Sequence, residues 1–195
     1  MNTLLERLQS LDTDINVSII GAGAMGKGLI YQCHITPGVR PVAIADLKIE
    51  KCIETAEMIG VKYRIVKNLS DLHDAIDEGV LAITDDGMLI AENEKHDVMV
   101  ESSNAIQAGA RFVITALERK KHVVLMNAEI DLVYGPYFMQ VASENGVTCS
   151  SIDGDQYGVM KRVIDDFQLW GFELVMAGNI KGFLDRYSNP VKIIP

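Results

Sequence analysis

Cysteine is scarce in this 195-residue chain, and the cysteines that occur form no recognisable pair. The three residues Cys33, Cys52 and Cys149 are widely separated, and none belongs to a Cys-x-x-Cys motif. A sparse, odd-numbered set is typical of reduced thiols that pack as small apolar groups inside a cytoplasmic protein. The chain therefore lacks the pattern of a disulfide-stapled secreted domain.

The chain also lacks an excess of basic residues and a long apolar run. Its 18 lysines and arginines are outnumbered by 27 aspartates and glutamates, which gives a formal net charge of −9. This charge argues against nucleic-acid partners, which need cations to neutralise phosphates, and more weakly against anionic membranes. No apolar stretch is long enough to span a bilayer, and residues 1–14 do not have the basic-then-apolar pattern of a signal peptide. We expect a cytoplasmic protein that binds neither nucleic acid nor membranes.

Familiar hydrolase, kinase and metal-site motifs are absent as well. The sequence contains no Gly-x-Ser-x-Gly, no His-Glu-x-x-His and no P-loop lysine motif. His34, His73 and His96 are not spaced as metal ligands. Hydrolase and kinase chemistry therefore have no support, and the histidines predict no metal site.

What the chain does have is a regular alternation of short β-rich runs and segments with helical periodicity. Strands are predicted at residues 16–20, 42–45, 63–66, 80–83, 97–100, 122–126, 147–150 and 172–176. Helices are predicted within residues 1–14 and at 25–33, 49–59, 87–91, 106–117, 132–144 and 159–167, with Ser70 as the N-cap of one more. Such alternation implies parallel strands joined by right-handed crossovers. The predicted fold class is α/β, a Rossmann-type doubly wound parallel sheet.

The most informative motif is the glycine loop Gly21-Ala-Gly23-Ala-Met-Gly26, which follows the first strand and opens a helix. In that context the Gly-x-Gly-x-x-Gly spacing is typical of dinucleotide binding. Gly21 permits a tight turn, Gly23 lets the backbone approach a pyrophosphate, and Gly26 allows close packing of helix on strand. The N–H groups at the helix start, around Ala24 and Met25, then face the phosphates.

Asp46 closes the second predicted strand, 20 residues after Gly26. A carboxylate at this position bonds the adenosine ribose hydroxyls of a dinucleotide. Because its charge repels a 2′-phosphate, Asp46 favours NAD, whereas the neighbouring Lys48 offsets that repulsion and leaves NADP open. The predicted cofactor is therefore NAD or NADP.

Ligands of a doubly wound sheet bind beyond the carboxyl ends of its strands. The polar residues that follow separate predicted strands are Asp46, Ser102, Ser103, Asn127, Glu129, Asp153 and Asp155. We expect them to line one edge, with Ser102 and Ser103 in the cofactor site near the nicotinamide. The run Lys120-Lys121-His122 precedes a strand and is predicted to be a solvated charge run at the opposite edge.

Hydride transfer to a carbonyl needs a proton donor and polar groups that fix the carbonyl oxygen, besides the nicotinamide. Lys181 is the candidate proton donor, because burial in a cleft lowers the pKa of a lysine side chain; the alternative is a surface loop lysine. The carboxylates that orient substrate hydroxyls or bind a divalent ion would be Glu129, Asp131, Asp153 and Asp155. The alternative is that they cap adjacent helices, which suits Asp131.

Several segments together resemble homoserine dehydrogenase-like NAD(P)-binding proteins. They are the runs 21–28, 98–101, 126–131 with Gly135-Pro136, 153–158, and 178–182 with Asp185, Tyr187, Asn189 and Pro190. The subgroup they resemble often carries a C-terminal SAF domain and includes a deoxyxylulose-phosphate reductoisomerase-like enzyme. The resemblance implies an NAD(P)-dependent oxidoreductase in which Asn127, Glu129, Asp155 and Lys181 lie near the nicotinamide or the substrate.

The resemblance also suggests how the chain is organised. Residues 1–150 are expected to form the NAD(P)-binding Rossmann domain, and residues 151–195 the start of a catalytic domain that is longer in relatives of this type. The expected activity is hydride transfer between a nicotinamide cofactor and a small hydroxylated or phosphorylated carbonyl compound. The alternatives are a non-catalytic dinucleotide-binding module or redox sensor, and a domain for another adenosine ligand such as S-adenosylmethionine. We also expect a homo-oligomer, because an uncovered domain leaves apolar surface exposed.

Overall fold

The computed structural model describes residues 3–152 and 157–178. The chain divides into two units, Met1–Ile152 and Asp153–Pro195. The sequence-based division placed this boundary between residues 150 and 151. The first unit holds the sheet and the candidate site.

The first unit is built on seven strands in the order β3-β4-β2-β1-β5-β6-β7, and every neighbouring pair is parallel. The strands are β1 (Ile15–Ile20), β2 (Val39–Ala45), β3 (Tyr63–Ile65), β4 (Leu81–Thr84), β5 (Val98–Glu101), β6 (His122–Leu125) and β7 (Cys149–Ser151). The order reverses between β1 and β5, which is the switch point where doubly wound sheets bind ligands. The predicted α/β fold class is confirmed.

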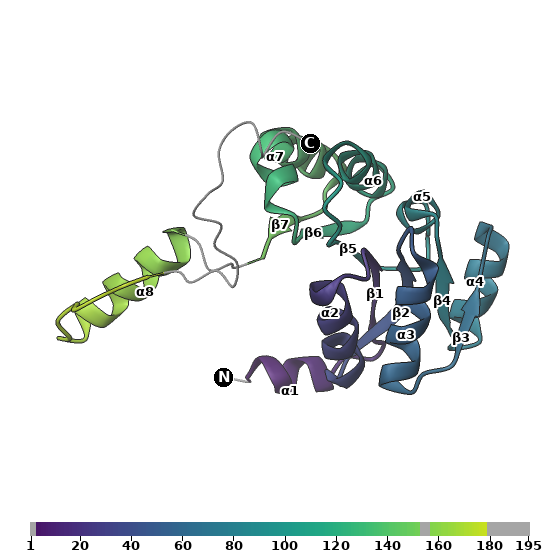
Figure 1. Cartoon of the computed structure of the whole chain (residues 1–195), viewed down its shortest axis with the longest axis horizontal. Coiled ribbons are helices and arrows are strands. Elements are labelled where there is room, and N and C mark those ends of the chain that lie inside the picture. The colour runs from purple at the N-terminus through teal and green to yellow at the C-terminus, as the bar shows by residue number, and fades with distance from the viewer. Residues whose placement is uncertain (1–2, 153–156, 179–195) are drawn as a thin grey trace, which may run out of the picture. The chain divides into compact units, whose positions relative to one another are not determined.

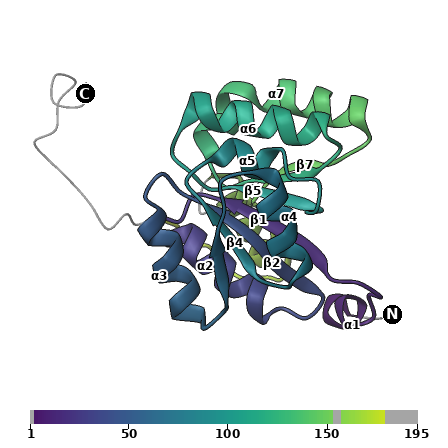
Figure 2. The same cartoon turned by 90° about the vertical axis from the view of Figure 1, so that its right-hand side faces the viewer.

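Helices cover both faces of this sheet (Figures 1 and 2). One face packs against α2 (Ala24–Ile35) and α3 (Ile49–Ile59). The other face packs against α4 (Leu69–Asp77), α5 (Gly87–Ala91), α6 (Ile106–Glu118) and α7 (Ala128–Asn145). Because both faces are covered, β4 is buried at every position, and β1 and β2 each end in four buried residues.

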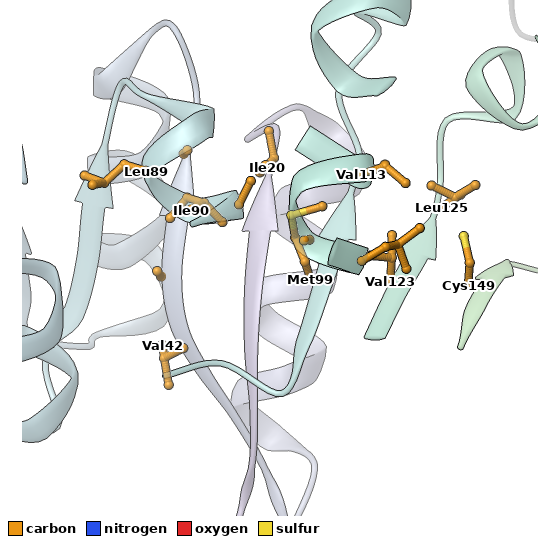
Figure 3. Packing of buried hydrophobic residues seen from close by; sticks show 14 of the residues in the cluster. Ile20, Val42, Leu89, Ile90, Met99, Val113, Val123, Leu125 and Cys149 are labelled. Atoms are coloured by element: carbon orange, nitrogen blue, oxygen red, sulfur yellow. The ribbon is translucent and has the colours of Figure 1, made fainter. Parts of the chain in front are cut away.

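The larger of the two cores lies under α4 to α7. Figure 3 shows Leu89 and Ile90 of α5 over the sheet near Ile20, with Met99 of β5 next to them and Val113 of α6 beyond. All five side chains belong to one cluster of buried apolar residues. Beneath this packing β1 and β5 pair in parallel with Ile20 opposite Glu101, which sets their carboxyl ends side by side and positions the candidate site.

Glycine ends two of the longer helices. Gly60 ends α3 with φ 71°, and Gly146 ends α7 with φ 69°. Both φ values fall in the left-handed region, where glycine carries no steric penalty, so each glycine ends its helix.

Two predicted helix starts are wrong. Asn68, not Ser70, caps α4, because the Asn68 side chain accepts a hydrogen bond from the backbone N–H three residues ahead at 2.9 Å. The helix predicted over 132–144 begins four residues earlier, at residue 128, and Asn127 is its N-cap. Asp131 therefore lies in the first turn of α7 instead of capping it, and its Oδ2 accepts a hydrogen bond from the Ser151 hydroxyl at 2.7 Å. In both helices an asparagine supplies the oxygen that the first turn needs.

The helix expected within residues 1–14 is α1 (Leu4–Gln9), shorter than predicted and closed by a capping box between Thr3 and Glu6. In the second unit, α8 (Tyr157–Leu169) agrees with the predicted helix. The strand predicted at 172–176 is wrong, since the described part of this unit offers no strand with which it pairs. Instead the Phe172 N–H donates to the carbonyl of Phe167, and the two rings meet edge to face at 6.1 Å between centroids.

The cysteines pack as the composition suggested. All three are free thiols, with Cys52 and Cys149 buried and Cys33 half-buried. Burial raises the pKa of Cys52 to about 12 and that of Cys33 and Cys149 to about 11. The thiols are therefore protonated at neutral pH and behave as small apolar groups. Across residues 3–152 and 157–178, no helix is long and apolar enough to cross a membrane.

Candidate functional site

The site is built on the glycine loop between β1 and α2. Gly21 has φ +101°, and a Cβ there would lie 2.7 Å from the carbonyl carbon of Ser102. A Cβ on Gly26 would lie 1.8 Å from the carbonyl oxygen of Gly21. The fold of the chain therefore requires glycine at both positions. At Gly21 the loop passes close to the backbone of the residues after β5, and at Gly26 the first turn of α2 passes close to Gly21.

Gly23 is different, because nothing in the described chain requires glycine there. It is the N-cap of α2 with φ −69°, which any residue adopts, and its carbonyl oxygen bonds the Lys27 N–H at 2.9 Å. A Cβ on Gly23 would have no atom within 4 Å. The backbone at Gly23 therefore faces open space, directly beside the helix N–H groups that have no intrahelical partner.

That open space belongs to a cavity of about 500 Å³ at the carboxyl ends of the strands. It extends from the end of β2, across the glycine loop, to the residues that follow β5, with the side of α6 as a wall. Its lining residues are Ile20, Gly21, Gly23, Ala45, Asp46, Leu47, Lys48, Lys51, Asp85, Gly87, Ser102, Ser103, Asn104, Ala105, Ala108 and Phe112. The cavity lies over the switch point between β1 and β5, where the fold predicts a ligand.

Asp46 ties the end of β2 to the glycine loop. Its Oδ2 accepts a hydrogen bond from the Ala22 N–H at 2.8 Å, and its Oδ1 accepts one from the Lys48 N–H at 2.9 Å. The Lys51 ammonium lies 3.8 Å from Oδ1. A carboxylate has about four acceptor positions, so Asp46 keeps capacity for ligand hydroxyls while it holds the loop. Lys48 and Lys51 line the same cavity and add positive charge beside it.

Ser102 and Ser103 line the other side of the cavity, and both hydroxyls are engaged within the protein. The Ser102 hydroxyl lies 2.9 Å from the carbonyl oxygens of Ile20 and of Gly21, to which it donates. The Ser103 hydroxyl donates to Glu101 Oε1. These serines therefore fix the loop that borders the cavity.

Glu101 and Asn127 lie behind this wall. The Glu101 side chain is fully buried at the end of β5, and burial raises its pKa; the Ser103 contacts and the Asn127 amide oppose that rise. Asn127 is 4% exposed, and its Oδ1 accepts a hydrogen bond from the Ile130 N–H at 3.3 Å as the cap of α7. Neither residue lines the cavity.

The structure brings together some of the predicted site residues and separates others. Gly21, Gly23, Asp46, Ser102 and Ser103 line one cavity. Gly26 is buried against Gly21, and Ala24 and Met25 are exposed on the first turn of α2. Glu129 is exposed on the first turn of α7 and does not line the cavity. Asp155 and Lys181 lie outside the described residues, as does Asp153.

Sequence reasoning missed several residues of the cavity wall. Lys51, Asp85, Asn104 and Phe112 all line it. Asp85 directly follows β4, so the rule for strand ends would have found it. Phe112 comes from the side of α6 and carries no signal in the sequence beyond its place in an amphipathic helix. Within the part of the chain that the structure describes, no three His, Cys, Asp or Glu side chains gather as a metal site would require.

No protein-family model matches the chain. Among curated proteins, the homoserine dehydrogenase of Bacillus subtilis (strain 168) is 24% identical over 132 residues, which cover 68% of this chain and 28% of the dehydrogenase. The chain therefore spans less than a third of the length of this relative.

Three solved structures show the same fold. A homoserine dehydrogenase from Thiobacillus denitrificans has a TM-score of 0.56 at 20% identity and covers 71% of this chain and 29% of its own. GenD2 from gentamicin A biosynthesis, in complex with NAD, has a TM-score of 0.57 at 13% identity. The match covers 80% of this chain and 39% of GenD2. The 1-deoxy-D-xylulose 5-phosphate reductoisomerase of Zymomonas mobilis, in complex with NADPH, has a TM-score of 0.53 at 20% identity. The match covers 73% of this chain and 40% of the reductoisomerase. The predicted resemblance is confirmed, as a similarity of sequence and fold to homoserine dehydrogenase and as a similarity of fold to the reductoisomerase.

Proposed function

We propose that this chain binds NAD or NADP and serves an oxidoreductase that transfers a hydride between the nicotinamide and a small hydroxylated or phosphorylated carbonyl compound. Two kinds of support converge on this function. The chain has a strand–glycine loop–helix unit beneath a cavity at the switch point of the sheet. The similar proteins include a dehydrogenase, a complex with NAD and a complex with NADPH.

The observation that carries the proposal is the open space in front of Gly23. Gly21 and Gly26 are explained by contacts within the chain, but Gly23 is not, because its Cβ would meet no atom within 4 Å. A glycine that the fold does not need, at a helix N-terminus that borders a cavity, is what close approach of a pyrophosphate requires. The residues present therefore fit a dinucleotide.

The test is a titration with NADH and with NADPH, followed by nicotinamide fluorescence, for the parent chain and for Gly23→Ala. The added methyl occupies the space in front of the loop without disturbing the chain, so we expect at least about tenfold weaker binding, equivalent to about 1.4 kcal/mol. Gly28→Ala is the matched control, because Gly28 lies in the helix that Gly23 caps and its Cβ would also meet nothing within 4 Å. Failure of the parent to bind either cofactor, or equal binding by Gly23→Ala, would contradict the proposal.

The choice between the two cofactors rests on charge around Asp46. The Asp46 carboxylate repels a 2′-phosphate, while the Lys48 and Lys51 ammonium groups attract one from the same cavity wall. The carboxylate also accepts two backbone hydrogen bonds, whose N–H dipoles oppose part of its negative field. The ratio of the two dissociation constants in the titration above measures this balance directly.

For the chemical step, we propose Lys181 as the proton donor, with Asn127, Glu129 and Asp155 as polar groups near the nicotinamide or the substrate. The basis is the resemblance of their segments to the oxidoreductase group, together with the position of Asn127 at the start of α7. Lys181→Ala should lower kcat by about 10²–10⁴-fold, the usual contribution of a positioned acid–base group, and leave the Kd for NADH unchanged. Full turnover by Lys181→Ala at every pH would show that this role is wrong.

Binding without turnover on a panel of hydroxylated and phosphorylated carbonyl compounds would favour the second candidate, a non-catalytic dinucleotide-binding module. The observation that keeps this candidate in view is that the chain spans only 28% of the curated relative.

We further propose a cytoplasmic homo-oligomer that acts on a small molecule. The thiols are unpaired, and the exposed side of α7 carries apolar side chains, among them Leu132, Val133 and Met139. Light scattering on the purified chain measures its mass and so tests the oligomeric part.

A further inference from the structure

Glu101 is a fully buried carboxyl group that ends β5 at the switch point of the sheet. It does not line the cavity, and the proposed function gives it no role. A buried carboxyl is expensive to desolvate, and an apolar residue would suit the end of a covered strand better. Its presence therefore calls for a specific set of contacts.

On one side, Glu101 holds the residues that form the cavity wall. Its Oε1 accepts hydrogen bonds from the Ser103 N–H, at 3.1 Å, and from the Ser103 hydroxyl. The Ser103 oxygen in turn accepts one from the Ala105 N–H at 3.2 Å. One carboxylate oxygen thus anchors the stretch 102–105, and all four of these residues line the cavity.

On the other side, Glu101 faces the start of α7. Its Oε2 and the Nδ2 of Asn127 are both buried, and neither has a hydrogen-bond partner of standard geometry. The Asn127 amide is near enough to lower the pKa of Glu101. Helix α6 leaves room for the group at Gly109, where a Cβ would lie 3.1 Å from the Glu101 carboxyl carbon. The pocket for this carboxyl is therefore built by the 102–105 stretch, the start of α7 and the side of α6.

We propose that Glu101 is a positioning residue, which holds the 102–105 wall of the cavity in the shape that receives the cofactor. The wall has no regular secondary structure, and the carboxylate supplies the acceptor for two donors of Ser103. The expected effect of Glu101 on cofactor binding rests on the proposed dinucleotide site. Its expected effect on the order of residues 102–105 rests on the geometry of the wall alone.

The experiment compares the parent chain with Glu101→Met and Glu101→Gln by amide hydrogen exchange, thermal unfolding and NADH titration. In Glu101→Met the amides of Ser103 and Ala105 should exchange at least about tenfold faster, because the Ser103 N–H loses its acceptor and the Ser103 hydroxyl that accepts from the Ala105 N–H is no longer held. The amide of Val66, which bonds the carbonyl of Ile83 at 2.8 Å in another part of the sheet, should not change. NADH binding should weaken about tenfold or more at a temperature where both proteins are folded, which the thermal unfolding curves establish, because the wall has lost its anchor.

Glu101→Gln keeps one acceptor oxygen, so its exchange rates and its Kd should lie between those of the parent and of Glu101→Met. Unchanged exchange at Ser103 and Ala105 would overturn the inference, and so would unchanged NADH affinity in Glu101→Met when the parent binds. If the parent binds neither cofactor but exchange at the wall accelerates, the positioning role stands and the proposed function fails. If Glu101→Met does not fold, the exchange rates of Glu101→Gln decide in the same way.

Discussion

Two polar clusters in the first unit are each built around a buried ionisable side chain, and they differ in the residues that they contact. One consists of Glu101, Ser103 and Asn127 at the carboxyl ends of the strands. The other consists of Ser18, Asn93 and His96, between β1 and the connection from α5 to β5. Each contains a fully buried ionisable group with one polar atom that lacks a hydrogen bond.

The difference lies in where the hydrogen bonds lead. Glu101 bonds a stretch that lines the cavity, whereas the His96 Nδ1 lies 3.1 Å from the Ser18 hydroxyl and 3.3 Å from the Asn93 amide, both buried. None of these three residues lines the cavity. Burial and a shifted pKa are common to both clusters, and of their two ionisable groups Glu101 is the one bonded to a residue of the cavity wall.

The two clusters also respond to pH in opposite directions. Burial disfavours charge in both, so it raises the pKa of Glu101 and lowers that of His96 from 6.5 to about 3, with the Lys121 charge acting in the same direction on His96. Ionisation of Glu101 therefore weakens the fold as pH rises through its folded pKa. Protonation of the unfolded chain at His96 weakens the fold as pH falls below 6.5.

The largest expected effect comes from His96. Between pH 6.5 and 3 the unfolded histidine binds a proton that the folded one does not, so the free energy of unfolding should fall by about 1.4 kcal/mol per pH unit. Its full contribution is of the order of 4–5 kcal/mol over the interval from 6.5 to the folded pKa of about 3. Urea unfolding at pH 7 and at pH 4.5 measures the effect.

His96→Gln is the matched variant for that measurement, because glutamine is polar but does not titrate. Carboxylates also begin to bind protons near pH 4.5, so the relevant quantity is the difference between parent and variant. The parent should lose about 3 kcal/mol more than His96→Gln between the two pH values. Equal losses in the two proteins would show that His96 titrates normally and that the second cluster is less enclosed than the first.

The comparison also shows which parts of the molecule the sequence could predict. Strands and the glycine loop follow from local patterns, because a short apolar run and a Gly-x-Gly-x-x-Gly spacing lie within a few consecutive residues. The two clusters do not, since Ser18 meets His96 across 78 positions of the chain. The residues next to Ser18 and His96 in the sequence contain no pattern that predicts this contact.

The wrong helix starts and the wrong strand have separate physical causes. Ser70 and Asp131 are good N-caps, but an asparagine lies upstream of each helix and takes the position first. The run 172–176 has the composition of a strand, and strand composition becomes a strand only beside a partner. For the candidate site, the residues at strand ends were predictable, whereas the wall from α6 depended on tertiary packing.

A smaller effect is expected for the matched substitutions Ser18→Ala and Ser103→Ala, which compare the two clusters in stability and in cofactor binding. Each substitution removes one hydroxyl that contacts the buried ionisable group. Ser18→Ala leaves a buried ring nitrogen with one partner fewer, so we expect it to cost about 1–3 kcal/mol of stability with no change in the Kd for NADH. Ser103→Ala keeps the backbone N–H bond to Glu101 and should cost about 1 kcal/mol or less.

The same Ser103→Ala substitution should nevertheless weaken NADH binding several-fold, because the anchor of the cavity wall loses one of its two donors. Denaturant unfolding and cofactor titration on the same two samples give both quantities. The pair is informative because the larger loss of stability is expected where binding is unaffected. If Ser18→Ala weakened binding as much as Ser103→Ala, the cavity wall would be responding to the stability of the whole sheet, and the two clusters would differ in position but not in function.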